Sequence, residues 1–222
     1  MNAMLLAAGR GERLRPITES IPKALVEVQG RSLLERHLDR LRDAGVRNVV
    51  INLGWLGEQI AERIGSGAGY GVDVAYSLEG DDILETGGGI QRALPLLGDG
   101  PFVVVNADVY TDMPLPTALP DDCLAHLVLV PNPDHKATGD FGLTDARVSN
   151  EPRSYTFSGV AIYRPGFFDG CEPGRFPLAP MLREAADAGT LSGELYEGVW
   201  EDVGTPERLA ALNANRGSRC GP

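Results

Sequence analysis

Apolar and polar positions alternate in blocks over the first half of the chain. Short apolar runs predict buried strands at residues 2–7, 46–53, 72–77 and 102–106. Between them, apolar side chains recur at helical spacing and predict helices at residues 32–44, 55–64 and 89–97. Strands that alternate with helices predict right-handed crossovers, and therefore a parallel arrangement with helices on both faces of the sheet.

The pattern changes in the second half. A proline-rich stretch at residues 113–120 precedes a predicted strand at 125–130, extended segments near 141–148 and 155–163, and helices at 178–188 and 206–213. Neither an internal repeat nor a low-complexity linker divides the chain. We therefore expect one α/β domain over residues 1–222, with a mixed, mostly parallel central sheet and a short tail at 217–222.

Composition narrows the range of partners. The formal net charge of −11 argues against a surface that follows nucleic acid or an anionic membrane, although a few local cations could still bind phosphates. Apolar runs fall short of the roughly 18 residues that a membrane span needs, and the three cysteines show no paired spacing. We expect a cytoplasmic protein without nucleic-acid or membrane partners, and we favour a monomer.

The loop after the first predicted strand is the first candidate for chemistry. Gly9 and Gly11 would let the backbone approach an anion, and Arg10, Arg13 and Arg15 add local positive charge. The loop is neither a dinucleotide fingerprint nor a P-loop, because the required third glycine and the Gly-Lys-Ser/Thr ending are missing. Taken alone it could equally be a tight turn with solvated arginines. Lys23, after Pro22, could likewise be a surface lysine.

Several motifs together give a more specific signal. The stretch LAAGRGERLRPIT is followed by PKALVEV, and the chain continues with LETGGGI at residues 84–90, VVNADV at 104–109, YTFSGVAIY at 155–163 and WEDVGTPERL at 200–209. This set resembles the signature of the sugar-1-phosphate nucleotidyltransferases over the whole chain. The resemblance implies a single Rossmann-like nucleotidyltransferase domain, with a nucleotide-binding half at residues 1–110 and a half at 111–216 that binds the sugar and completes the metal site.

The resemblance also implies a reaction. A sugar 1-phosphate would attack the α-phosphorus of a nucleoside triphosphate, and pyrophosphate would leave. It favours UTP with N-acetylmuramate 1-phosphate, in the recycling of cell-wall sugars. A phosphate monoester is largely ionised at neutral pH because its second pKa is about 6, so no general base is required. Positioning and charge neutralisation would carry the catalysis.

Roles follow for residues that match the motifs. Arg13, Lys23 and Asp108 would be catalytic, and Asp108 and Asp202 would hold Mg²⁺, which prefers oxygen ligands. The nucleotide would be bound by these positions: Leu6, Ala7, Ala8, Gly9, Gly11, Arg13, Lys23, Glu79, Glu85, Thr86, Gly87 and Asn106. The sugar phosphate would be bound by another set: Asn106, Asp140, Thr156, Ser158 and Gly159.

Each carboxylate also has a plainer interpretation. Asp108 and Asp202 could be turn or cap residues, Glu79 a solvated loop acid, and Asp140 a turn acid. Arg153, at the entry of the extended segment 155–163, is a further hypothesis: it would bind the phosphate of the sugar. The family usually has Asn-Gly-Asp where this chain has Asn106-Ala107-Asp108, and the stretch between Asp140 and Tyr155 is short.

Four alternative functions stay open at this point. The base and sugar could be those of a mannose-1-phosphate guanylyltransferase or a glucose-1-phosphate thymidylyltransferase. A cytidylyltransferase for a non-sugar phosphate shares this core. A non-catalytic sensor of nucleotide sugars is the alternative from another class, but such a sensor would not need both metal carboxylates, and this chain has both.

Overall fold

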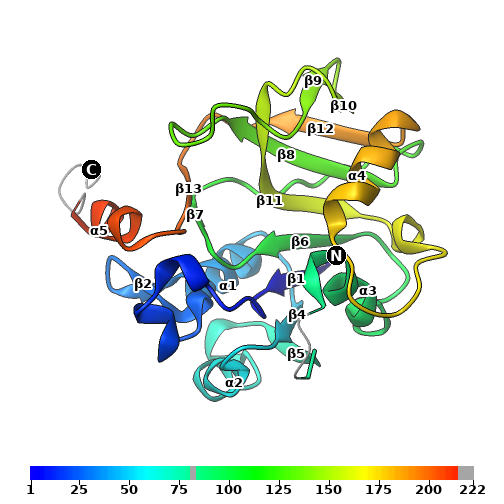
Figure 1. Cartoon of the computed structure of the whole chain (residues 1–222). Coiled ribbons are helices and arrows are strands. Elements are labelled where there is room, and N and C mark those ends of the chain that lie inside the picture. Colours follow the sequence, from blue (N-terminus) through cyan, green and yellow to red (C-terminus); the bar gives the residue numbers. More distant parts are fainter. Residues whose placement is uncertain (81–83, 215–222) are drawn as a thin grey trace.

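The computed structural model describes residues 1–80 and 84–214. Their centre is a nine-stranded sheet in the order β5-β4-β1-β6-β11-β8-β12-β10-β9 (Figure 1). The strands are β1 (Asn2–Leu6), β4 (Asn48–Leu53), β5 (Asp73–Leu78), β6 (Phe102–Asn106), β8 (Ala125–Pro131), β9 (Gly142–Thr144), β10 (Arg147–Ser149), β11 (Tyr155–Tyr163) and β12 (Leu191–Leu195). The predicted α/β domain with a mixed sheet is confirmed.

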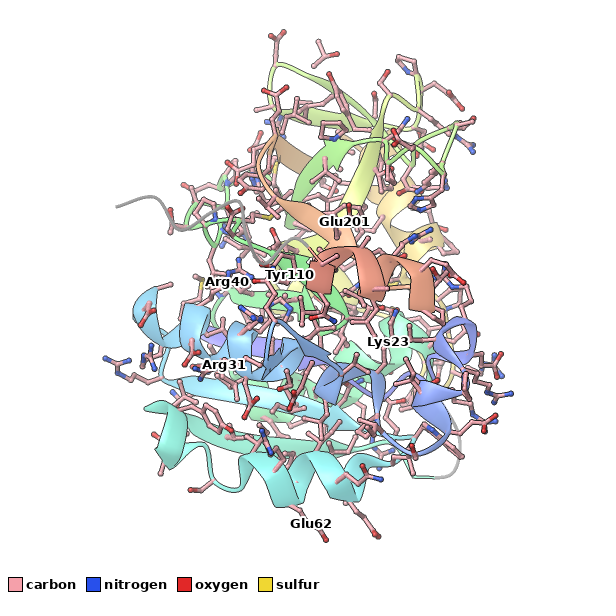
Figure 2. The ribbon with its side chains drawn as sticks, turned by 90° about the vertical axis from the view of Figure 1, so that its left-hand side faces the viewer. Lys23, Arg31, Arg40, Glu62, Tyr110 and Glu201 are labelled. Carbon is pink, nitrogen blue, oxygen red and sulfur yellow. The ribbon has the colours of Figure 1, made fainter. Side chains whose placement is uncertain are left out.

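One side of the sheet, which we call the parallel half, contains β5, β4, β1 and β6, all parallel. Successive side chains of a strand point to opposite faces, so Ala3 and Leu5 belong to one core cluster and Met4 to the other. α1 (Leu33–Asp43) and α2 (Gly57–Ile64) pack into the first cluster, and α3 (Glu85–Leu97) into the second. Figure 2 shows Glu62 pointing outward from α2.

The remaining strands form the mixed half. β11 is antiparallel to both β6 and β8, and it carries an irregularity between Phe157 and Val160. β12 is parallel to β8, and α4 (Leu178–Asp187) packs against β10 and β12. β12, whose sequence is LSGEL, was not predicted as a strand. The extended segment expected at 141–148 is two short strands, because Asp145 and Ala146 adopt left-handed backbone and turn the chain.

Two small pairs complete the fold. β2 (Glu27–Val28) pairs with β3 (Arg31–Ser32), and β7 (Val109–Thr111) pairs antiparallel with β13 (Trp200–Asp202). β7 and β13 lie side by side between the two halves of the molecule (Figure 1). After β13, α5 (Pro206–Ala214) places Leu209 in a third cluster with Leu14. The last part of the described chain is therefore packed onto the glycine-rich N-terminal loop.

Helix boundaries agree with the sequence except at α3. This helix begins at Glu85 and not at Gly89, because its glycines lie inside it and permit close packing. A Cβ on Gly88 would lie 2.1 Å from the carbonyl oxygen of Gly174, and one on Gly89 would lie 2.6 Å from Oε1 of Glu79. Within residues 1–80 and 84–214, the helices are too short and too polar to cross a membrane. The predicted tail at 217–222 lies outside the described residues.

Candidate active site

Three adjoining cavities follow the carboxyl ends of the parallel strands, and Asn106 lines all of them. We call them the strand-end, helix and carboxylate cavities, with volumes of about 190, 420 and 260 Å³. The strand-end cavity is lined by the loops after β1, β4, β5 and β6, which is where ligands bind in open α/β sheets. The helix cavity reaches α4, and the carboxylate cavity contains Arg13, Asp108, Thr156 and Asp202.

The loop after β1 is shaped by Gly11. Its φ is +62°, and a Cβ there would lie 2.9 Å from Cγ2 of Thr18 and 3.1 Å from Cβ of Lys23. Glycine therefore lets the turn of Glu12–Leu14 approach the segment that carries Lys23. Leu6, Ala7, Ala8 and Gly9, which the resemblance assigns to the nucleotide, line the strand-end cavity.

Arg10 and Trp55 form a pair at the outside of this loop. The Arg10 guanidinium lies 5.7 Å from the centre of the Trp55 ring, and the indole nitrogen donates to the carbonyl of Thr18 at 3.0 Å. Trp55 precedes α2, is 37% exposed and contacts the loop from its surface.

Lys23 lies between two carboxylates. Its Nζ is 2.6 Å from Oδ2 of Asp108 and 3.6 Å from Oδ1 of Asp202, and its side chain is only 12% exposed. Two arginines approach the other oxygen of Asp202: Arg13 at 3.4 Å and Arg208 at 3.2 Å. The site is thus a compact group of three cations and two carboxylates.

The pair β7 and β13 brings these carboxylates together. Asp202 stands opposite Val109 in the antiparallel register, and the amide of Val203 donates to the carbonyl of Asp108 at 3.1 Å. Gly204 allows the next turn, because a Cβ there would lie 3.1 Å from Oδ2 of Asp202. Two residues 94 positions apart in the numbering therefore meet through a backbone ladder and do not depend on flexible side chains.

A buried chain of hydrogen bonds lies at the floor of the strand-end cavity. The amide of Ala7 donates to Oδ1 of Asn52 at 2.6 Å, and Nδ2 of Asn52 donates to Oε1 of Glu79, also at 2.6 Å. Oε2 of Glu79 accepts from the amide of Leu84 at 2.9 Å. Glu79 is 5% exposed, so its interpretation as a solvated loop acid is wrong. The chain connects the end of β4 with the loops after β1 and β5.

The start of α3 forms another wall. Glu85 and Thr86 line both the strand-end and the helix cavities, and the Glu85 carboxylate is 2.8 Å from a guanidinium nitrogen of Arg175. Gly87 is buried, and a Cβ on it would lie 2.5 Å from the Phe176 ring. The structure therefore shows a packing role for Gly87 and places Glu85 and Thr86 at the cavities.

β11 supplies the wall of the carboxylate cavity, including Thr156 and Ser158. Their hydroxyls are already engaged: Thr156 donates to Oδ1 of Asn132 at 2.9 Å, and Ser158 donates to the carbonyl of Val128 at 2.6 Å. Gly159 has φ +80°, and a Cβ there would lie 2.6 Å from Nδ2 of Asn106. These residues therefore shape the wall and position Asn106.

Comparison with known proteins agrees with this geometry. Residues 2–151 match the family model described as nucleotidyl transferase. This protein is a member of the nucleotidyl transferase family. It is 49% identical to N-acetylmuramate alpha-1-phosphate uridylyltransferase of Neisseria meningitidis serogroup B, over 98% of this chain and 99% of that one. It is 34% identical to the protein of the same name from Caulobacter vibrioides, over 96% and 95%.

A solved structure shares the fold of this nucleotidyl transferase. It is a Bacillus anthracis protein in complex with sucrose, assigned provisionally as a glucose-1-phosphate thymidylyltransferase. The TM-score is 0.82 at 21% identity, over 100% of this chain and 98% of that chain. At this level of identity the likeness concerns the fold alone.

The two aspartates of this nucleotidyl transferase fit the expected Mg²⁺. Oδ1 of Asp202 is buried and has no hydrogen-bond partner among the described residues; Lys23 Nζ, at 3.6 Å, is too far for a hydrogen bond, so this oxygen can accept a closer cation. Within the described ranges no group of three or more metal-binding side chains occurs. Mg²⁺ commonly takes one or two carboxylates and completes its shell with water and substrate phosphates. Asp108 and Asp202 are the residues that would hold it.

Two predictions about sugar contacts have different outcomes in the structure. Asp140 lines the helix and carboxylate cavities, where its Oδ2 accepts from Lys136 at 2.6 Å and from the amide of Phe157 at 2.9 Å. Arg153 is not among the residues of the three cavities, and its Nε donates to Glu151 at 3.1 Å. The structure does not bring Arg153 to the site.

Sequence reasoning missed several cavity residues. A polar residue inside the apolar run of β4 was the available signal for Asn52. His135, which is exposed, and Lys136, which is partly exposed, line the carboxylate cavity. Nothing local distinguished the cavity residues Phe157, Leu178, Arg183 and Trp200. The same holds for Arg208, which lies outside the cavities and contacts Asp202.

A fourth cavity of about 530 Å³ lies apart from this cleft. It is lined by Arg31 of β3, by residues of α1 including Arg40, and by the far end of the β7–β13 pair including Tyr110. Figure 2 shows Arg31 and Arg40 on the left of the molecule, Tyr110 nearer the middle and Lys23 on the right. Within the described residues this cavity shares no lining residue with the other three.

Proposed function

We propose that this nucleotidyl transferase transfers UMP from UTP to N-acetylmuramate 1-phosphate, giving the nucleoside-diphosphate sugar and pyrophosphate. What supports the two substrates is the full-length relative with 49% identity that carries this name. What supports the chemistry is the meeting of Lys23, Asp108 and Asp202 beside the cavity formed by the strand ends. A role in the recycling of cell-wall sugars follows from these substrates. The cytoplasmic location and the monomeric state stay predictions.

The reaction needs alignment more than proton transfer. A phosphate oxygen of the sugar 1-phosphate forms a bond to the α-phosphorus of UTP, and the bond from that phosphorus to the bridging oxygen of the β-phosphate breaks. The attacking group is ionised at neutral pH, since its second pKa is about 6. The reacting phosphates carry negative charge, and preorganised cations stabilise the charge that develops in the transition state.

Each part of the site has a distinct task in this proposal. The loop of Leu6–Gly9 lies along the nucleotide, and Lys23 and Arg13 neutralise its phosphates. Mg²⁺ on Asp108 and Asp202 would supply further positive charge at the reacting phosphates. Arg208 holds Asp202 through both its carbonyl, at 3.3 Å, and its carboxylate. The acceptor sugar would occupy the helix and carboxylate cavities.

Pyrophosphate release tests the proposal directly. The protein with Mg²⁺ is assayed with UTP and N-acetylmuramate 1-phosphate, GTP and mannose 1-phosphate, dTTP and glucose 1-phosphate, and CTP with non-sugar phosphates. We expect the first pair to have the highest kcat/KM. A higher value for another pair would overturn the assignment of substrates. Tight binding of a nucleotide sugar without turnover of any pair would overturn catalysis and favour a sensor.

A further inference from the structure

The helix cavity is the largest of the three adjoining cavities. It begins at Glu85, Thr86 and Asn106, which it shares with the strand-end cavity, and ends at α4. Most of its far wall is apolar: Phe141, Phe157, Pro177, Leu178, Ala179 and Leu182. One cationic side chain, Arg183, lies in this apolar wall.

Arg183 is held in place without a carboxylate. Its guanidinium lies 5.4 Å from the centre of the Phe141 ring. Its Nη1 approaches the carbonyl of Asp140 and Oδ1 of Asn150, both at 3.5 Å, the outer limit for a hydrogen bond. The carbonyl of Arg183 accepts from Nδ2 of Asn150 at 3.0 Å, which fixes this turn of α4. The Arg183 side chain is thus held in one orientation, while most of its N–H groups make at most weak hydrogen bonds within the protein.

The other lysines and arginines of the cleft are paired differently. Arg13 lies 3.4 Å from Asp202, Lys23 lies 2.6 Å from Asp108, and Lys136 lies 2.6 Å from Asp140. Over residues 1–80 and 84–214, Arg183 is the one lysine or arginine of the three cavities without a carboxylate oxygen within 4.0 Å. In a protein of net charge −11, an arginine left unpaired in a cavity is suited to a carboxylate of the ligand.

We propose that Arg183 binds the lactyl carboxylate of the acceptor sugar and selects N-acetylmuramate over N-acetylglucosamine 1-phosphate. This inference rests on the proposed function. The two sugars differ by the lactyl ether on O3, which adds one carboxylate and one methyl group. Arg183 offers a planar set of donors that matches a carboxylate. Leu178 and Leu182, in the same wall, offer apolar surface to the methyl group.

Packing on Phe141 is the competing explanation for Arg183. A cation over an aromatic ring contributes to stability whatever the substrate is. The two explanations differ in one measurable way. A packing role affects all acceptors alike, whereas recognition of a carboxylate affects only acceptors that carry one.

The experiment compares two acceptors with UTP and Mg²⁺: N-acetylmuramate 1-phosphate and its lactyl carboxamide, which is neutral and has nearly the same shape. The ratio of their kcat/KM values is measured for the natural protein, Arg183→Met and Arg183→Lys. Arg92→Met, which removes an exposed arginine on α3, is the matched control. Thermal unfolding verifies that each variant is folded.

We expect the natural protein and Arg92→Met to prefer the carboxylate by about 10- to 100-fold, the range of a hydrogen-bonded ion pair. Arg183→Met should reduce this ratio to about 1 through loss of the carboxylate substrate alone, and Arg183→Lys should give an intermediate ratio. An unchanged ratio in Arg183→Met, or an equal loss for both acceptors, would overturn the role of Arg183. If the natural protein turned over neither acceptor, the proposed function itself would fail.

Discussion

The parallel half and the mixed half of the sheet supply cleft residues in different ways. In the parallel half, each strand delivers its residues at its carboxyl end: Ala7 after β1, Asn52 near the end of β4, Glu79 after β5 and Asp108 after β6. In the mixed half, Thr156 and Ser158 lie within β11, and Arg183 lies in the middle of α4. The parallel half presents loops to the ligand, and the mixed half presents the side chains of strand and helix faces.

Because of this difference, most charged groups of the cleft come from the parallel half and most of its apolar surface comes from the mixed half. The parallel half supplies Lys23 and Asp108, and its Asn52–Glu79 bonds join three loops into one floor. The mixed half supplies mostly apolar surface and one unpaired arginine. β13, which pairs with β7 between the two halves, carries Asp202 into the charged group of the parallel half. The catalytic group is therefore shared, while discrimination of the acceptor is local to the mixed half.

The largest effect is expected where the halves meet. Asp202→Asn removes the negative charge on which Lys23, Arg13 and Arg208 converge, and it removes a proposed Mg²⁺ ligand. We expect kcat to fall by about 1000-fold, as for loss of one preorganised electrostatic group. The loss should be similar with every acceptor and should become smaller as the Mg²⁺ concentration is raised. Steady-state kinetics across a Mg²⁺ titration measure it.

Asp145→Asn is the matched control for that variant. Asp145 is an exposed acid in the turn between β9 and β10, with left-handed backbone that asparagine also tolerates. It should leave kcat unchanged. If Asp202→Asn kept more than a tenth of the activity, Asp202 would carry no essential charge, and the parallel half alone would supply the essential charge of the catalytic group.

The second effect concerns the backbone of the parallel half. Gly11→Ala forces a side chain onto left-handed backbone, 2.9 Å from Cγ2 of Thr18 and 3.1 Å from Cβ of Lys23. We expect the free energy of unfolding to fall by about 2–3 kcal/mol. Gly9→Ala is the control, because a Cβ on Gly9 meets nothing within 4 Å and its φ is not positive. It should change stability by less than about 0.5 kcal/mol in urea unfolding.

Equal losses in the two glycine variants would show that the loop is rigid throughout. In that case the strain would not be concentrated at the contact with Lys23. A loss confined to Gly11→Ala would show that this single glycine sets the distance between the loop and the charged group.

The parallel half is also the part that sequence reasoning predicted best. Most of its strands are apolar runs, and parallel strands present their following loops at one edge, so the loops that carry Gly9 and Asp108 could be placed together. The roles of Lys23 and Asp108 followed from the resemblance to a family. The meeting of Asp108 with Asp202 depends on β7 and β13, which are only three residues each and have no periodic pattern. Only resemblance to a family predicted it.

The mixed half shows where sequence reasoning is weakest. β12 takes its place through parallel pairing with β8, more than fifty residues away in the numbering, and no local feature reports such a contact. Arg153 was proposed for the sugar phosphate because it precedes β11, but its side chain pairs with Glu151. Arg183 has the helical spacing of an ordinary surface arginine, and only the packing of α4 brings it to the cleft.

The smallest expected effect concerns the dependence of stability on pH. It is tested by comparing one histidine from each half. His37 on α1 is buried, and burial together with the charge of Arg40 lowers its pKa to about 3 from an ordinary 6.5. His37 therefore becomes protonated near pH 6.5 in the unfolded chain, whereas in the folded protein it stays neutral down to about pH 3. The stability that depends on neutral His37 is complete above pH 6.5 and is lost as the pH falls toward 3.

We expect the free energy of unfolding to fall by up to about 1.4 kcal/mol for each pH unit between pH 6.5 and 4.5. Glu35 adds little in this window: although burial raises its pKa, hydrogen bonds from Ser32, Tyr70 and Arg63 lower it to about 2, so its effect begins below pH 4.5. Urea unfolding at several pH values should show a flatter dependence for His37→Gln, whose amide oxygen can still accept from Arg40.

His126→Gln is the counterpart in the mixed half. Burial lowers the pKa of His126, but the Glu194 carboxylate at 3.9 Å acts in the opposite direction. Replacement of His126 should therefore flatten the dependence of the unfolding free energy on pH less than replacement of His37 does. If His126→Gln flattened it as much, the acid sensitivity would be spread over both halves. The parallel half, which holds most of the charged groups of the cleft, would then not be the part of the molecule that acid destabilises first.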